Sequence, residues 1–151
     1  MAMPATTTFF YRTYDEALSL LTEARNYVAG LYIHEAGSFS ATLRMAQCCE
    51  TMRLTARLTH VMAWLLAQRA VYAGEITLEE SVSEKFCLGG RSICLEESHY
   101  LDCIDDKSLG TLLDRSLRLY IRISRLDMMV KDRVAKALGT GSLSTGADFL
   151  E

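Results

Sequence analysis

Apolar residues recur every three or four positions over most of the chain, which is the period of amphipathic α-helices. The first such segment runs from about residue 14 to residue 32, and Thr13 followed by Glu16 fits a capping box at its start. One face of this segment is apolar and the other is polar, so it must pack against another element. No run of alternating β-branched residues follows. The pattern predicts an all-α fold.

A second and longer helix is predicted for residues 40–73, with Gly74 as the residue that ends it. One apolar face holds Met45, Cys48, Met52, Ala56, Thr59, Ala63, Leu66 and Ala70. A second apolar face holds Leu43, Leu54, Leu58, Val61 and Leu65. The mixed strip between them holds Glu50, Arg53, Arg57, Trp64 and Gln68. A helix that is apolar on two faces is normally central, and part of its surface is available for a subunit interface.

Residues 75–108 form an acidic connection. Thr77 with Glu80 predicts another capping box and a short helix to about Phe86, whereas residues 87–106 show no sustained period. From residue 75 to residue 106 there are nine acidic residues against two basic ones, a net charge of −7. A long loop of this kind in a compact domain is usually functional or mobile.

The last helix is predicted for residues 109–138, with Ser108 as its cap and Gly139 at its end. Residues 107–138 carry a net charge of +5, and the densest basic positions are Arg115, Arg118, Arg122 and Arg125. We weigh three interpretations of this arginine stripe: a solvated helix face, a partner-binding surface and a nucleic-acid surface. A fourth possibility is that the acidic connection folds over it. The predicted division is a flexible N-terminus (1–13), a three-helix bundle domain (14–138) and a flexible tail (139–151).

The composition narrows the class of protein. The 151 residues carry a net charge of −3, which argues against nucleic-acid binding. No apolar run is long enough to span a bilayer, and no secretory signal precedes the first helix. Five cysteines without an export signal are expected to be reduced thiols. We therefore predict a cytoplasmic protein that binds neither membrane nor nucleic acid.

No arrangement of nucleophile, base and acid is recognisable, so we predict that the protein is not an enzyme and needs no cofactor. One alternative is a zinc- or redox-sensing module, because zinc prefers four sulfur and nitrogen ligands. Its candidate ligands are Cys87, Cys94, His99 and Cys103. Their spacing contains no CxxC knuckle, so ordinary loop thiols are the favoured explanation. A further hypothesis treats Arg53, Arg57 and Trp64 as a half-exposed binding hot spot, against a plain local salt bridge between Glu50 and Arg53.

Two sequence runs resemble a known family. The run ETMRLTARLTHVMAWLLAQRAVYAGEIT, residues 50–77, resembles the central segment of the alphaproteobacterial RcdA proteins, the "regulator of CtrA degradation". The run SLRLYIRISRLD, residues 116–127, is similar to the matching part of their last helix. The resemblance covers about residues 14–138. The positions that match the family's motif are Arg53, Arg57, Trp64, Gln68, Arg69 and Glu75.

The resemblance implies a dimeric three-helix bundle that acts as an adaptor for the ClpXP protease and helps deliver cell-cycle regulators. It also implies partners: the ClpX unfoldase, a response-regulator adaptor, and a further adaptor or a cargo protein. An uncharacterised dimeric interaction protein stays open as an alternative. The chain departs from the family pattern in the connection around Gly89–Gly90 and in the short tail after Leu138.

Overall fold

The computed structural model of the chain describes residues 5–34, 40–98 and 106–141. Three long helices make up most of it: α1 (Ala5–His34), α2 (Ala41–Ala73) and α5 (Lys107–Gly141). Two short helices, α3 (Leu78–Ser81) and α4 (Arg91–Cys94), lie between α2 and α5 in the chain. The described residues contain no strand. The predicted all-α bundle with a long central helix is confirmed.

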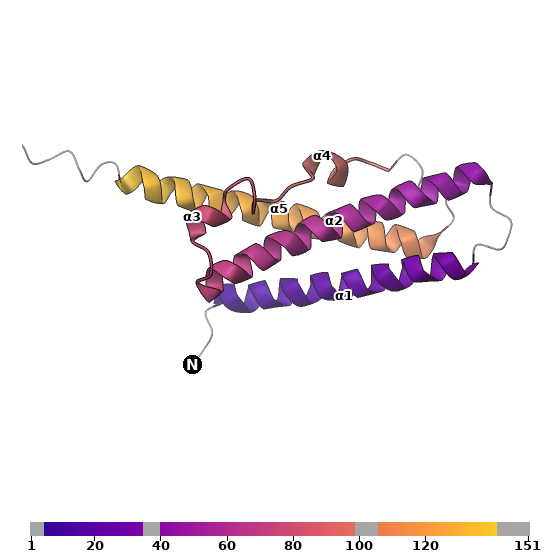
Figure 1. Cartoon of the computed structure of the whole chain (residues 1–151), viewed down its shortest axis with the longest axis horizontal. Helices are drawn as coiled ribbons and strands as arrows, with labels where there is room; N and C mark the ends of the chain where they lie inside the picture. The colour runs from indigo at the N-terminus through magenta and orange to yellow at the C-terminus, as the bar shows by residue number, and fades with distance from the viewer. Residues whose placement is uncertain (1–4, 35–39, 99–105, 142–151) are drawn as a thin grey trace, which may run out of the picture.

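The three long helices pack lengthwise, with α1 antiparallel to the other two (Figure 1). Because α2 and α5 run in the same direction, the chain between them must return along the length of the bundle. Residues 75–98 make this return and include α3 and α4; we call them the strap. The strap lies along α2 and α5, on the side away from α1 (Figure 1). Residues 75–98 of the acidic connection therefore lie along α2 and α5, and its residues 99–105 lie outside the described residues.

Helix α1 begins at Ala5, nine residues before the predicted start. The predicted capping box at Thr13 is wrong, because the buried Thr13 hydroxyl donates to the carbonyl of Phe9, 3.0 Å away, within the helix. An aromatic contact accounts for the longer helix: the Phe10 ring packs at 5.3 Å from that of Tyr72, at the far end of α2. Residues 5–13 are thus helical rather than a flexible N-terminus.

The predicted ends of α2 are confirmed. The Ser40 hydroxyl accepts from the backbone N–H of Leu43, and Gly74 adopts a left-handed conformation with φ of 75° at the other end. The predicted distribution of its faces is wrong in one respect. Met45, Met52 and Leu66 are exposed, whereas the mixed strip from Glu50 to Gln68 is largely buried. Helix α5 and the strap both contact this strip, where Arg57 and Trp64 find hydrogen-bond partners.

Helix α5 is longer than predicted at both ends. Asp106, rather than Ser108, caps it, since its Oδ1 accepts from the backbone N–H groups of Ser108 at 3.0 Å and Leu109 at 3.1 Å. Gly139 does not end the helix, which continues to Gly141. A glycine ends a helix when it turns to positive φ, and among the described glycines only Gly74 and Gly90 do so. The predicted tail beyond residue 141 lies outside the described residues.

The core lies along the axis where the three long helices meet. Its fully buried members include Leu20 from α1, Leu54, Leu58 and Leu65 from α2, and Leu119, Tyr120 and Ile123 from α5. Cys94, at the end of α4, is also fully buried and belongs to this core. The strap is therefore part of the folded unit, and it fixes the geometry of the polar groups on α2.

Candidate functional site

A row of polar side chains on α2 faces α5 and the strap: Glu50, Arg53, Arg57, Trp64 and Gln68. We call this row the polar seam. Helical spacing of three and four residues places its members above one another on one side of α2. Each is buried or nearly so, and a buried polar group is costly unless it is hydrogen-bonded. The hydrogen-bond partners of these side chains therefore show which elements the polar seam joins.

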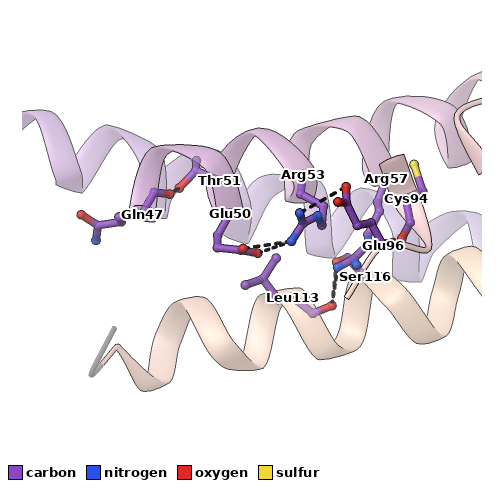
Figure 2. Close-up of polar contacts among 9 residues, drawn as sticks. All are labelled: Gln47, Glu50, Thr51, Arg53, Arg57, Cys94, Glu96, Leu113 and Ser116. Carbon is purple, nitrogen blue, oxygen red and sulfur yellow. Dashed lines mark hydrogen bonds and ion pairs between the residues drawn. The ribbon is translucent and has the colours of Figure 1, made fainter. Parts of the chain in front are cut away.

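Arg53 lies between two carboxylates (Figure 2). Its Nη1 donates to both oxygens of Glu50, each at 2.9 Å, and its Nη2 is 3.6 Å from Glu96 of the strap. Glu50 is 0% exposed and Glu96 is 55% exposed, so only the second of these pairs reaches solvent. The predicted local salt bridge between Glu50 and Arg53 is present, and Arg53 extends it to the strap.

Arg57 is 4% exposed and is held by backbone carbonyls. Its Nε donates to the carbonyl of Cys94 at 2.8 Å, and its Nη1 donates to that of Leu113 on α5 at 3.2 Å (Figure 2). Burial lowers the pKa of the Arg57 guanidinium, and the neighbouring positive charge of Arg53 lowers it further. A single side chain thus joins α2, α4 and α5.

Trp64 and Asp127 make the second junction between α2, α5 and the strap. The Trp64 indole N–H donates to Asp127 Oδ1 at 2.8 Å, and the backbone N–H of Leu88 approaches the same oxygen at 3.4 Å. Lys131 donates to the other carboxylate oxygen at 2.6 Å, from one turn further along α5. Asp127 is 6% exposed, so these donors replace the water that its charge would otherwise need.

Two glycines bring the strap close to α2. A side chain on Gly90 would overlap the ring of His60, and one on Gly89 would lie 3.3 Å from it. Gly90 also has a positive φ of 73°, which L residues with side chains rarely adopt. The Tyr120 hydroxyl donates to the carbonyl of Gly89 at 2.7 Å, and burial raises the pKa of Tyr120 to about 12. The double glycine therefore permits a close crossing of the strap over His60, most strictly at Gly90.

The hypothesis of a half-exposed hot spot is wrong for Arg57 and Trp64, because both are 4% exposed and bonded within the bundle. Gln68 is buried too, and its amide nitrogen has no hydrogen-bond partner within the part of the chain described. The other two family-motif positions differ, since Arg69 and Glu75 are exposed. Arg69 lies over the ring of Tyr14 on α1, 6.0 Å from its centroid.

The arginine stripe on α5 divides into two pairs. Arg115 donates to Glu23 at 3.0 Å and Arg122 donates to Glu16, so both are ion-paired to α1. These contacts lower the pKa of Glu23 and raise that of Arg115, chiefly through their mutual hydrogen bond. Arg118 is 79% exposed and pairs only with Asp114 of its own helix among the described contacts, and Arg125 is exposed. Arg118 and Arg125 are thus the members of the stripe that face solvent.

The candidate zinc ligands lie partly outside the described residues, which include Cys87 and Cys94 but not His99 or Cys103. Burial raises the pKa of the Cys94 thiol, which opposes formation of the thiolate that binds metal. Within the described residues, no three His, Cys, Asp or Glu side chains are grouped to hold a metal ion. The four-ligand hypothesis stays a prediction.

Asp127 and Asp106 were not singled out by the sequence analysis, although both organise the structure. Asp127 falls four residues after Ile123 and seven after Tyr120, on the apolar stripe of α5. An acidic residue at such a position indicates a buried hydrogen-bond acceptor. The indole N–H of Trp64, also on a largely apolar helix, is a donor of the matching kind. Asp106 also accepts from the Tyr27 hydroxyl at 2.6 Å, a contact between residues 79 apart that no local pattern reveals.

A family model and a solved structure are similar to this chain. A family model described as "Protein of unknown function (DUF1465)" matches residues 2–151. The crystal structure of RcdA from Caulobacter crescentus CB15 is similar, with 35% sequence identity and a TM-score of 0.62. The similarity covers 80% of this chain and 89% of that one. The chain belongs to the RcdA family. No curated protein matches it in sequence.

Membership of the RcdA family confirms the resemblance found in the two sequence runs. Three of the six motif positions, Arg53, Arg57 and Trp64, hold α2 to α5 or the strap. A further finding concerns membranes: none of the described helices combines the length and apolarity that crossing a bilayer requires.

Proposed function

We propose that the protein is a non-enzymatic, cytoplasmic adaptor that helps deliver cell-cycle regulators to the ClpXP protease. The observation that carries this proposal is its similarity to RcdA, at 35% identity over most of both chains. The mechanism is effective concentration: a scaffold that holds cargo beside the unfoldase turns a weak encounter into an intramolecular one. The partners we propose are ClpX, a response-regulator adaptor, and a further adaptor or cargo protein.

The structure supports this proposal because different residues stabilise the bundle and face solvent. The seam and the strap stabilise the bundle, while exposed side chains on the outer helix faces stay available to partners. We propose that the protein acts as a homodimer, as the resemblance implies, and its mass in solution by light scattering tests this point. A mass equal to that of one chain would contradict the proposed homodimer.

We further propose that Arg118 and Arg125 contribute a partner surface, because they are the solvent-facing members of the arginine stripe. The test is retention of purified ClpX by the immobilised chain in the presence of the response-regulator adaptor. The double variant Arg118→Glu/Arg125→Glu should lower retention while its circular dichroism stays unchanged. Arg133→Glu, another exposed arginine of α5, is the matched control. Normal retention by the double variant would show that these arginines form a solvated face.

A further inference from the structure

Four sulfur-bearing side chains lie together on the solvent side of α2, near its start. They are Met45, Cys48, Cys49 and Met52, and we call them the sulfur patch. Both methionines are 67% exposed, and both cysteines are exposed free thiols. Free cysteine is among the most buried residue types, and methionine usually fills gaps in a core. Packing within the bundle therefore does not explain why these four residues share an outer face.

Helical geometry places the four side chains around one point on the surface of α2. Met45 and Met52 are seven positions apart, so they differ by only about 20° around the axis and lie nearly in line along the helix. Cys48 and Cys49 lie between them along the axis, about 40–60° to either side of that line. Each cysteine is three residues from one methionine and four from the other, spacings at which Cβ atoms are about 5–6 Å apart.

The other residues of this run are engaged elsewhere. Ala46 and Glu50 are buried on the opposite side of the helix, and Glu50 is paired with Arg53. The Gln47 side chain donates to the Tyr27 hydroxyl of α1 at 3.0 Å. Within the part of the chain that the structure describes, the two cysteines have no third His, Cys, Asp or Glu grouped with them. The donors available at the sulfur patch are therefore two thiols and two thioethers.

We propose that the sulfur patch binds one Cu(I) ion. Thiolates and thioethers are soft donors of the kind that select Cu(I), whereas zinc takes thiolates, imidazoles and carboxylates and would find only two ligands here. The site shares no residue with the zinc ligands predicted from the connection. It also goes beyond the proposed function, because nothing in the adaptor role requires a metal ion.

The binding step exchanges protons for copper. Each cysteine that binds forms a Cu–S bond and releases its S–H proton to solvent, whereas each methionine donates a lone pair and loses no proton. No electron is transferred, so the copper stays Cu(I). None of the four residues belongs to the hydrophobic core, so the bundle should keep its fold with and without the ion.

The test is a titration of Cu(I) into the full chain, kept reduced and free of oxygen, in competition with the chelator bathocuproine disulfonate. We expect uptake of about one ion per chain, sulfur neighbours only in X-ray absorption, and binding at least about a hundredfold tighter than that of Zn²⁺. With ¹³C-labelled methionine methyl groups, the signals of Met45 and Met52 should shift while those of Met128 and Met129 stay in place. Nitrogen or oxygen neighbours, or equally tight binding of Zn²⁺, would overturn the proposal.

Two double variants separate the thiols from the thioethers. Cys48→Ser/Cys49→Ser should remove the competition with the chelator. Met45→Leu/Met52→Leu should weaken Cu(I) binding by at least about 10–100-fold, the loss that removal of a mere outer-shell partner already causes at metal sites. Circular dichroism should be unchanged in both, because all four side chains are exposed. Unchanged affinity in either double variant would contradict the four-sulfur site.

Matched controls remove sulfur elsewhere in the molecule. Cys87→Ser deletes a partly exposed thiol of the strap, and Met128→Leu/Met129→Leu deletes two exposed thioethers of α5. Both controls should bind Cu(I) like the wild type, and an equal loss in either would show adventitious binding to exposed sulfur only.

The mass of the protein in solution completes the test. It should stay unchanged on addition of Cu(I), whereas a mass that doubles would assign the ligands to two copies of the chain and overturn the proposal. Retention of ClpX enters none of these measurements. The copper site and the adaptor role can therefore fail independently of each other.

Discussion

At the residue scale, the buried Arg57 shows how an internal cation can be satisfied without a carboxylate partner. Its guanidinium donates to the carbonyls of Cys94 and Leu113, which belong to α4 and α5. The sequence predicted the Glu50–Arg53 pair because those residues are three apart on one helix. It did not predict the acceptors of Arg57, since they are backbone atoms 37 and 56 residues away. Residue type alone carries no information about such acceptors.

We predict that Arg57→Met destabilises the fold by about 2–3 kcal/mol, because two buried carbonyls lose their charged donor. The measurement is the free energy of unfolding in urea, followed by circular dichroism. Arg133→Met, at an exposed position of α5, is the control and should change stability by less than about 0.5 kcal/mol. An equally small effect for Arg57→Met would mean that water satisfies both carbonyls.

Stability should decrease at alkaline pH. Burial raises the pKa of the Cys94 thiol and raises that of Tyr120 to about 12. In the unfolded chain such groups ionise near about 8.5 and about 10. Because the folded state keeps these protons to higher pH, the stabilisation is complete below about pH 8 and is lost as the pH rises toward about 12.

Urea unfolding at about pH 7.5, 9 and 10 measures this dependence. Tyr120→Phe, which cannot ionise at that position, should show a smaller decrease above about pH 9. A free energy of unfolding that stays constant or rises over this range would contradict the assignment.

At the element scale, the helix ends divide into those with local signals and those without. The ends of α2 and the capping box at Thr77 are formed by residues within four positions of each other, and they were predicted correctly. The start of α1 was wrong because its first turns are stabilised by a contact between Phe10 and Tyr72. The predicted short helix to about Phe86 ends at Ser81 instead. Residues 87–106 were predicted as irregular, yet Gly89 and Gly90 give the strap a specific crossing over His60. Long-range contacts therefore decide the elements whose local signals are weak.

Gly90→Ala should destabilise the fold by more than about 1 kcal/mol, because the new methyl group meets His60 and the backbone has a positive φ. Adding His60→Ala should restore only the steric part of this loss. Gly110→Ala is the control: nothing lies within 4 Å of the added atom in α5, so it should stabilise by up to about 1 kcal/mol. Thermal unfolding of the four proteins, wild type included, tests these effects. Full recovery in the double variant would contradict the backbone contribution.

At the scale of the whole molecule, the bundle separates residues that stabilise from residues that can bind. The sequence predicted an all-α bundle, and the matching runs on α2 and α5 predicted the family. The division of the motif was not predictable: Arg57 and Trp64 are internal, whereas Arg69 is exposed. The same holds for the arginine stripe, where Arg115 and Arg122 pair with α1 and leave Arg118 and Arg125 facing solvent. The spacing of apolar and polar residues shows which side chains share one face of a helix. The order and direction of the helices determine which other helix, or solvent, that face meets.

The proposed adaptor role is tested most directly by a pull-down of purified ClpX with the wild-type chain as bait, with and without the proposed response-regulator adaptor. The proposal predicts that ClpX is retained when that adaptor is present and much less in its absence. A bait with a denatured bundle, produced by Arg57→Met at a urea concentration that unfolds only the variant, gives the background. No retention under either condition would contradict the proposed role in ClpXP delivery.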